Sequence, residues 1–335
     1  MSILRTADFD YELPAEAIAQ TPIEPRDAAR LLDTTTMADH LFTDLPHLIR
    51  PADLVVVNRT KVRAARLWGH KPLSGGKVEA LLLRQLGPAR WQAVVRPARR
   101  LRPGSTIDFG GVTAVVESLA EGTAVLQLDA KSAMAAAGEL PLPPYIHHQI
   151  PDPGRYQTIF AREEGSAAAP TAALHFTSRV VAAFRSRGIE MTEVVLHIGL
   201  DTFRPISTAE IDQHRIHEEE FVVGEEAVAA VEACRARRGR VVAVGTTVVR
   251  TLESVAMPGG LIRAGRGETG LYITPGYEFM VVDGLVTNFH LPRTTLLVLL
   301  AAFMGDRWRE AYQVALARGY RFASFGDAMY AERPR

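Results

Sequence analysis

Between about Arg63 and Pro144 the chain changes its sequence pattern, and this change limits the possible folds more than any other feature. Short alternating or β-branched runs, such as Trp91–Val95 and Thr123–Leu128, are separated by Gly and Pro at close spacing. That pattern is typical of a small antiparallel barrel. Before it, Asp53–Asn58 is a continuous β-branched run of the kind buried on both faces of a parallel sheet.

After residue 150, helical and strand patterns alternate again, with helices expected at 178–187 and 225–238 and a buried helix starting near Thr294. The sequence therefore predicts an α/β fold in which a discontinuous α/β core domain, residues 1–62 and 146–335, carries an inserted small antiparallel β-barrel domain, residues 63–145. The proline-rich run 140–146 forms a stiff return to the core.

Composition excludes several classes of protein. The chain has 38 Lys plus Arg and 38 Asp plus Glu, so its net charge creates no overall positive electrostatic field that would attract nucleic acid. A single cysteine, Cys234, permits neither an internal disulfide nor a multi-cysteine zinc site, which suits the cytoplasm. The N-terminus lacks the apolar core of a signal peptide, and the longest apolar run, 296–304, is too short to span a membrane.

One dense basic patch stands out against the balanced charge. It contains four arginines within seven residues, Arg96, Arg99, Arg100 and Arg102. A solvated loop of the barrel and a contact with the phosphates of a nucleic acid are both compatible with it.

Polar residues directly follow four strand-like runs. The small-residue loop 165–177 delivers His175, and similar polar segments occupy 196–203, 244–250 and 287–292. Open α/β sheets bind ligands at the carboxyl ends of their strands, so we expect these segments to converge at one edge of the sheet.

Gly245-Thr246-Thr247 lies between a strand pattern and a helix pattern, so its backbone N–H groups form a potential anion site. A plain N-cap by Thr246 or Thr247 is the alternative. The segment is neither a Walker loop, since Gly-Lys-Ser/Thr is missing, nor a Rossmann fingerprint, since it has one glycine.

His214 and His217 have the spacing that places two imidazoles on one helix face, followed by acids. A zinc hydrolase is therefore one alternative function, although His-Glu-x-x-His is absent. General acid-base catalysis by His, Asp and Glu in a pocket requires fewer assumptions, and we expect no metal.

Many motifs together resemble the queuosine-pathway family of S-adenosylmethionine:tRNA ribosyltransferase-isomerases. They are spread in order over essentially the whole chain, at residues 19–22, 24–27, 75–79, 141–146, 156–158, 168–177, 196–199, 202–203, 243–247, 250–254, 275–277, 287–292, 320–322 and 326–329. The resemblance implies an α/β domain with an inserted β-barrel.

The resemblance also implies a reaction. The ribosyl portion of S-adenosylmethionine is transferred to 7-aminomethyl-7-deazaguanine in the tRNA anticodon and isomerised, giving epoxyqueuosine with release of adenine and methionine. S-adenosylmethionine is then a ribosyl-donor substrate. The implied partner is the tRNA anticodon stem-loop, and we expect a cytoplasmic monomer that does not associate with membranes.

Within this chemistry, our candidates for proton transfer are His175 and His290, with Glu219 third. Arg250 and Thr246-Thr247 are candidates to hold the methionine carboxylate or a tRNA phosphate, and Asn288 and Asp327 to hold ribose hydroxyls or base edges. The complete set of expected substrate-binding residues is Thr171, His197, Thr202, Phe203, Gly245, Thr246, Thr247, Arg250, Asn288 and Asp327. The four patch arginines are the candidate nucleic-acid contacts.

The chain departs from the family pattern at several turns. Leu200 and Asp201 replace two small residues, and Arg59 stands where the family has an acid. These departures leave room for a divergent paralogue that uses a small-molecule acceptor, or none. A further alternative is a non-catalytic RNA-binding protein that uses the arginines from Arg96 to Arg102.

Overall fold

The computed structural model describes residues 4–63, 65–120, 122–128, 138–148, 150, 152–199 and 205–333. The chain forms two compact units. The larger contains Met1–Thr60, Pro143–Glu163 and Ala169–Arg335, and the smaller contains Lys61–Leu142 and Glu164–Ala168. The α/β fold with an inserted antiparallel barrel is therefore confirmed, whereas the domain boundaries at 62/63 and 145/146 stay a prediction.

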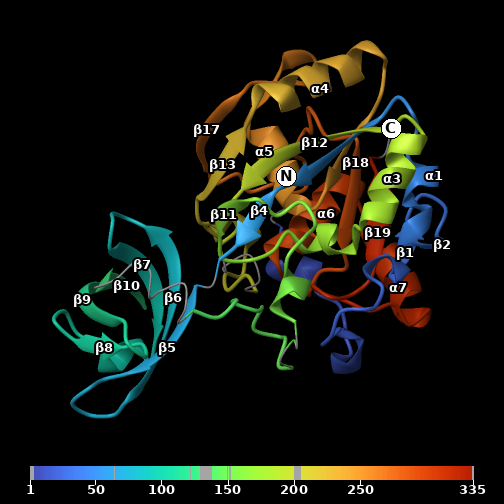
Figure 1. Ribbon diagram of the computed structural model, residues 1–335. Coiled ribbons are helices and arrows are strands. Elements are labelled where there is room, and N and C mark those ends of the chain that lie inside the picture. Colours follow the sequence, from blue (N-terminus) through green and yellow to red (C-terminus); the bar gives the residue numbers. More distant parts are fainter. Residues whose placement is uncertain are drawn as a thin grey trace. The chain divides into compact units, whose positions relative to one another are not determined.

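The smaller unit is a closed barrel of six antiparallel strands in the order β10-β7-β6-β5-β8-β9 (Figure 1). Alternate residues fill its interior, as Trp91, Ala93 and Val95 do on β7. The sequence pattern did not indicate β5. The strands are β5 Arg66–His70, β6 Lys77–Gln85, β7 Arg90–Arg96, β8 Thr106–Asp108, β9 Thr113–Ala120 and β10 Thr123–Leu128.

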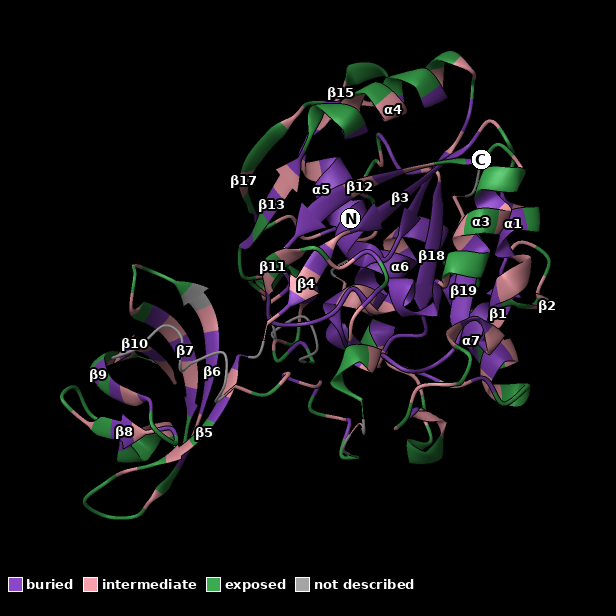
Figure 2. Ribbon diagram, in the orientation of Figure 1, coloured by how far each residue is buried: buried purple, intermediate pink, exposed green. Residues whose placement is uncertain are grey.

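The larger unit is built on a nine-stranded mixed sheet in the order β17-β13-β12-β3-β14-β18-β19-β1-β2. Its central strands β12, β3, β14 and β18 run parallel, and β3, β14 and β18 are buried along their full length (Figure 2). This explains why they are continuous apolar runs. The strands are β1 Arg30–Asp33, β2 Ala38–Leu41, β3 Leu54–Asn58, β12 Glu190–Leu196, β13 Glu219–Val223, β14 Val241–Val244, β17 Gly265–Thr269, β18 Gly284–Asn288 and β19 Ala328–Glu332.

Helices cover the sheet. Val55 and Val57 of β3 share a core with Phe176 and Phe184, whereas α4 and α5 pack against β12 and β3. The helices are α1 Leu45–Leu48, α3 Ser178–Ser186, α4 Glu225–Ala236, α5 Thr246–Ser254, α6 Thr295–Met304 and α7 Arg307–Ala317. The hydroxyls of Thr177 and Thr294 accept backbone N–H groups at the starts of α3 and α6, so these two residues are the N-caps of their helices.

The remaining regular elements are short. Two-stranded sheets pair β4 with β11 and β15 with β16, and 3-10 turns connect the longer elements. The strands are β4 Thr60–Val62, β11 Glu163–Ser166, β15 Ala256–Met257 and β16 Leu261–Ile262. The 3-10 turns are η1 Thr6–Phe9, η2 Ala15–Ala17, η3 Arg26–Ala28, η4 Phe42–Asp44, η5 Ala98–Arg100, η6 Pro153–Tyr156, η7 Thr171–His175, η9 Ile211–Gln213 and η10 Pro258–Gly260.

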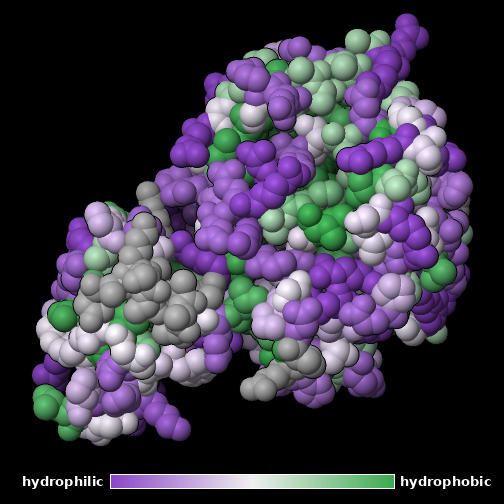
Figure 3. Space-filling view, in the orientation of Figure 1, coloured by the Kyte–Doolittle hydropathy of each residue, from purple (hydrophilic) through white to green (hydrophobic). Residues whose placement is uncertain are grey.

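On the face shown in Figure 3, hydrophilic residues cover most of the larger unit. Among the described helices, none combines the length and the apolar character that crossing a bilayer requires.

Gly239 leads from α4 into β14 and tolerates no side chain. A Cβ atom there would lie 1.7 Å from the Ala52 carbonyl oxygen and 2.8 Å from Cys234 Sγ. We expect Gly239→Ala to lower the free energy of unfolding by roughly 3 kcal/mol, because the backbone must move to relieve the overlap. Urea denaturation followed by circular dichroism measures this. Gly265→Ala is the matched control, since a Cβ there meets nothing within 4 Å, and an equal loss in both variants would contradict the steric explanation.

Candidate active site

The carboxyl ends of two neighbouring parallel strands form the base of the site. β14 ends at Val244 and continues through Gly245 into α5, while β18 ends at Asn288 and continues to His290. Parallel strands bring their carboxyl ends to the same edge, which confirms the expected meeting of these two segments. The loop containing Thr171 contributes a third wall.

The start of α5 depends on glycine. Gly245 is the N-cap residue with φ +92°, and its N–H donates to the Val286 carbonyl at 2.8 Å. A left-handed φ favours glycine because it has no Cβ. The cap is therefore neither Thr246 nor Thr247, and both threonines face the pocket instead.

Asn288 is held between two side chains of η7. Thr171 Oγ1 donates to its Oδ1 at 2.9 Å, and its Nδ2 lies 3.4 Å from His175 Nε2. An amide nitrogen only donates, so His175 Nε2 accepts and the imidazole is neutral. Burial lowers the pKa of His175 to about 4. Its ring packs against Phe42 and does not line the pocket.

His290 does line the pocket, and both polar groups of its backbone are held. Its N–H donates to Tyr312 Oη at 2.7 Å, and Tyr11 Oη donates to its carbonyl at 2.5 Å. Its Nε2 lies 3.0 Å from Thr287 Oγ1. Burial lowers the pKa of the imidazole to about 3, so His290 is a neutral base at pH 7.

The N-terminal segment braces the same loop beyond His290. The Arg293 N–H donates to the Phe9 carbonyl at 2.9 Å, and its side chain forms a 2.9 Å ion pair with Asp10. Arg293 has φ +55°, an unfavourable conformation for a non-glycine residue, which these two contacts help to maintain.

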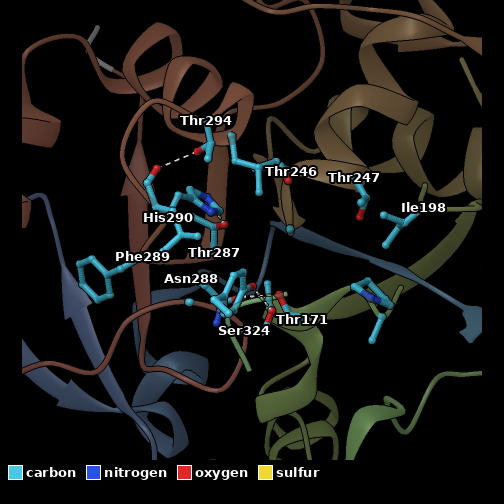
Figure 4. A pocket seen from close by; sticks show the side chains of 18 residues that line it. Thr171, Ile198, Thr246, Thr247, Thr287, Asn288, Phe289, His290, Thr294 and Ser324 are labelled. Carbon is cyan, nitrogen blue, oxygen red and sulfur yellow. Dashed lines mark hydrogen bonds between the residues drawn. The ribbon is translucent and has the colours of Figure 1, made fainter. Parts of the chain in front are cut away.

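These segments enclose a pocket of about 600 Å³ of empty space, including its open mouth (Figure 4). None of its described lining residues is acidic or a lysine or arginine. They are Tyr145, Ala169, Pro170, Thr171, Ala172, Ile198, Gly245, Thr246, Thr247, Thr287, Asn288, Phe289, His290, Leu291, Thr294, Leu296, Ala323 and Ser324. Its apolar walls can bury part of a ligand, and its hydroxyls can orient that ligand.

Six of the expected site residues line this pocket, namely Thr171, Gly245, Thr246, Thr247, Asn288 and His290. Five described ones do not, namely His175, His197, Glu219, Arg250 and Asp327. Thr202 and Phe203, together with Leu200 and Asp201, lie outside the described residues.

Arg250 and Glu219 form a buried ion pair with each other. The other two guanidinium nitrogens of Arg250 donate to the carbonyls of Leu271 and Thr269, and Glu219 Oε1 accepts the Gly199 N–H at 2.7 Å. The pair thus connects α5 to the loop after β12. Each of the three guanidinium nitrogens of Arg250 therefore has a partner within the protein.

Asp327 and His197 also have partners within the protein. The Asp327 carboxylate accepts backbone N–H groups from Arg30 and Arg321 at 2.9 and 2.8 Å, which joins the starts of β1 and β19. His197 Nδ1 lies 2.8 Å from Thr60 Oγ1. At the altered turn after β3, Arg59 forms a 3.2 Å ion pair with Glu163.

The expected helical pair of histidines is wrong. His214 follows the 3-10 turn η9 in an extended conformation and His217 lies in irregular chain, so no helix face presents both. Within the described part of the chain, no three His, Cys, Asp or Glu side chains are placed to hold a metal ion.

The sequence analysis missed three tyrosines of the site. The hydroxyls of Tyr11 and Tyr312 bond to the backbone of His290 from segments far away in sequence, and no local motif indicates this. Tyr145, which lies in the proline-rich return, lines the pocket with its hydroxyl 2.6 Å from Ser324 Oγ. Burial raises the pKa of Tyr145 to about 12, so it stays protonated.

The four patch arginines belong to the smaller unit. Arg96 ends β7, Arg99 and Arg100 lie in η5, and Arg102 follows it, all exposed.

Comparison with known proteins covers nearly the whole chain. S-adenosylmethionine:tRNA ribosyltransferase-isomerase from Moorella thermoacetica is 49% identical over 340 residues, covering 97% of this chain and 99% of the relative. The corresponding protein from an Anaeromyxobacter species is 52% identical over 345 residues, covering 98% and 99%.

A crystal structure of S-adenosylmethionine tRNA ribosyltransferase from Thermotoga maritima matches with a TM-score of 0.56 and 37% identity, covering 96% of this chain and 99% of that one. The model of the family described as queuosine biosynthesis protein matches residues 6–331. Fold and sequence therefore agree that the chain belongs to the queuosine biosynthesis protein family.

Proposed function

We propose that this chain is an S-adenosylmethionine:tRNA ribosyltransferase-isomerase. It transfers the ribosyl portion of S-adenosylmethionine to 7-aminomethyl-7-deazaguanine in tRNA and isomerises it to the epoxycyclopentanediol of epoxyqueuosine, releasing adenine and methionine. The observation that carries the proposal is a pocket lined by hydroxyls and a neutral histidine, in a chain about half identical over its length to proteins with this name.

The reaction begins with loss of a proton from C5′, which the adjacent sulfonium acidifies. His290 is the base in this proposal, because its neutral imidazole lines the pocket and two tyrosines hold its backbone. Ring opening and adenine loss follow, the amine of the deazaguanine adds, and an alkoxide displaces methionine to close the epoxide. His175 orients Asn288 in this assignment, and Asn288 and Thr171 hold ribose hydroxyls.

Glu219 has a structural part in this assignment. Its carboxylate already holds Arg250 and the Gly199 N–H, so it positions the loop that carries the pocket residue Ile198 and takes no proton from the substrate.

The partner in this proposal is the anticodon stem-loop of a tRNA, bound by a monomer in the cytoplasm. The exposed side chains of Arg96, Arg99, Arg100 and Arg102 fit contacts with RNA phosphates, since guanidinium groups bind phosphate oxygens strongly. The full-length relatives are named for a tRNA substrate, which favours tRNA over a small-molecule acceptor.

An assay with S-adenosylmethionine labelled in its ribose tests the proposal. We expect label in the RNA, together with equimolar adenine and methionine, only when tRNA carrying 7-aminomethyl-7-deazaguanine is present. Reactions with the free deazaguanine or without acceptor are the controls. Adenine release that is indifferent to tRNA would refute the proposal.

A further inference from the structure

The hydroxyl of Thr247 is a buried polar group that has no protein partner. Thr247 is 8% exposed, and its Oγ1 forms no hydrogen bond within the described structure. Leaving such a group unpaired is costly, so buried hydroxyls without a partner are uncommon in native proteins. Thr247 lies in the wall of the pocket, beside Thr246 and near Ile198 in Figure 4.

The backbone around this hydroxyl offers further donors. The Gly245 N–H is bonded to Val286, and the N–H groups of Val248 and Val249 point to the Gly245 carbonyl. In a helix of nine residues, the first N–H groups have no partner within the helix, which here leaves those of Thr246 and Thr247. Two amides and one hydroxyl are therefore available together.

The charge distribution determines which kind of ligand group fits there. The start of α5 carries the positive end of the helix dipole, and no acidic side chain is among the described lining residues. The basic side chain nearest along the helix, Arg250, does not line the pocket, and each of its guanidinium nitrogens is bonded to Glu219 or to a backbone carbonyl. An anionic group of a ligand would therefore be bound by the first turn of α5.

We infer that Thr247 Oγ1 and the N–H groups of Thr246 and Thr247 bind the α-carboxylate of the methionine part of S-adenosylmethionine. This inference rests on the proposed function. Since the helix start repels cations, the sulfonium lies farther into the pocket, away from α5. A phosphate of tRNA has similar acceptor chemistry and is the competing source of the anion.

Binding calorimetry with two ligands tests the inference. S-adenosylmethionine and its decarboxylated analogue differ only in the carboxylate, so the ratio of their affinities measures the subsite. We expect Thr247→Val to weaken S-adenosylmethionine binding by about tenfold, the value of one charge-assisted hydrogen bond, and to leave the analogue's affinity unchanged. Thr251→Val is the matched control, because Thr251 is buried on the same helix, its hydroxyl donates to the Thr247 carbonyl, and it does not line the pocket.

The outcomes are distinguishable. If the wild-type protein binds neither ligand, with or without precursor tRNA, the proposed function fails. If it binds both equally, or if Thr247→Val weakens both equally, only the carboxylate subsite is refuted. Filter binding of precursor tRNA tests whether the anion is a tRNA phosphate. If Thr247→Val loses affinity for tRNA but keeps the ratio of affinities for S-adenosylmethionine and its analogue, the subsite binds phosphate and the inference is refuted. Removing an unpaired buried hydroxyl should not lower Tm, so misfolding does not obscure the result.

Discussion

His290→Gln lowers the rate of adenine release from S-adenosylmethionine by about 10²- to 10⁴-fold, the contribution expected of a general base. Glutamine is similar in size to histidine and hydrogen-bonds, but it does not accept a proton at neutral pH. Binding of S-adenosylmethionine should change by less than about threefold, because the other walls of the pocket remain. Single-turnover kinetics with precursor tRNA, together with calorimetry, separates the rate from the binding.

His175→Gln is the matched control for this prediction. His175 is equally buried but does not line the pocket, and it contacts Asn288 instead. We expect a smaller loss of rate, accompanied by a higher KM, since the orientation of Asn288 is disturbed. Equal losses of rate in both variants would contradict the assignment of the base to His290, and a larger loss in His175→Gln would assign the base to His175.

Lowering the pH from 7 to 5 should destabilise the larger unit by about 4 kcal/mol through His175 and His290 alone. Burial lowers their pKa values to about 4 and 3, whereas an unfolded histidine titrates near pH 6.5. Between pH 6.5 and about 4 the unfolded chain therefore binds protons that the folded chain does not, and stability falls as the pH falls. At pH 5 each histidine lowers the free energy of unfolding by roughly 2 kcal/mol, because the pH is then about 1.5 units below the pKa of an unfolded histidine.

Urea denaturation at pH 7 and pH 5, followed at 222 nm, measures this difference. All the α-helices of the described chain belong to the larger unit, so the signal reports on that unit. His175→Gln and His290→Gln should each remove about half of the difference, whatever their own effect on stability at pH 7. His47→Gln is the control, because His47 is exposed. A pH difference that persists unchanged in the double variant would contradict the assignment.

The local sequence pattern predicted strands and helix starts correctly where neighbouring residues determine the conformation. The run Leu54–Asn58 is a strand buried on both faces, and the caps Thr177 and Thr294 begin their helices. In these cases the period of apolar residues and a single hydroxyl determine the local conformation. The spacing of His214 and His217 was a weaker pattern. It suggested a shared helix face, but the two histidines lie on no helix.

Some residues of the pocket could likewise be predicted from the sequence, and others could not. Thr246 and Asn288 could be predicted because polar residues at the carboxyl end of an apolar strand lie at the ligand edge of a sheet. Arg250 and Asp327 lie in motifs that resemble those of the family, but their side chains bond to partners inside the protein. Nothing near a polar residue in the sequence tells whether its partner is a ligand or another part of the chain.

The sequence by itself determined the α/β class, the inserted barrel, the family and the strand ends that form the site, because these depend on local pattern and on motifs in order. Only the tertiary structure decided which histidine lines the pocket, which arginine is occupied and which hydroxyl is unpaired. The physical reason is that burial and hydrogen bonding depend on residues far apart in the chain, such as Tyr11 and His290, which are 279 positions apart. Protonation states and free donors are therefore properties of the packed site, not of any single segment.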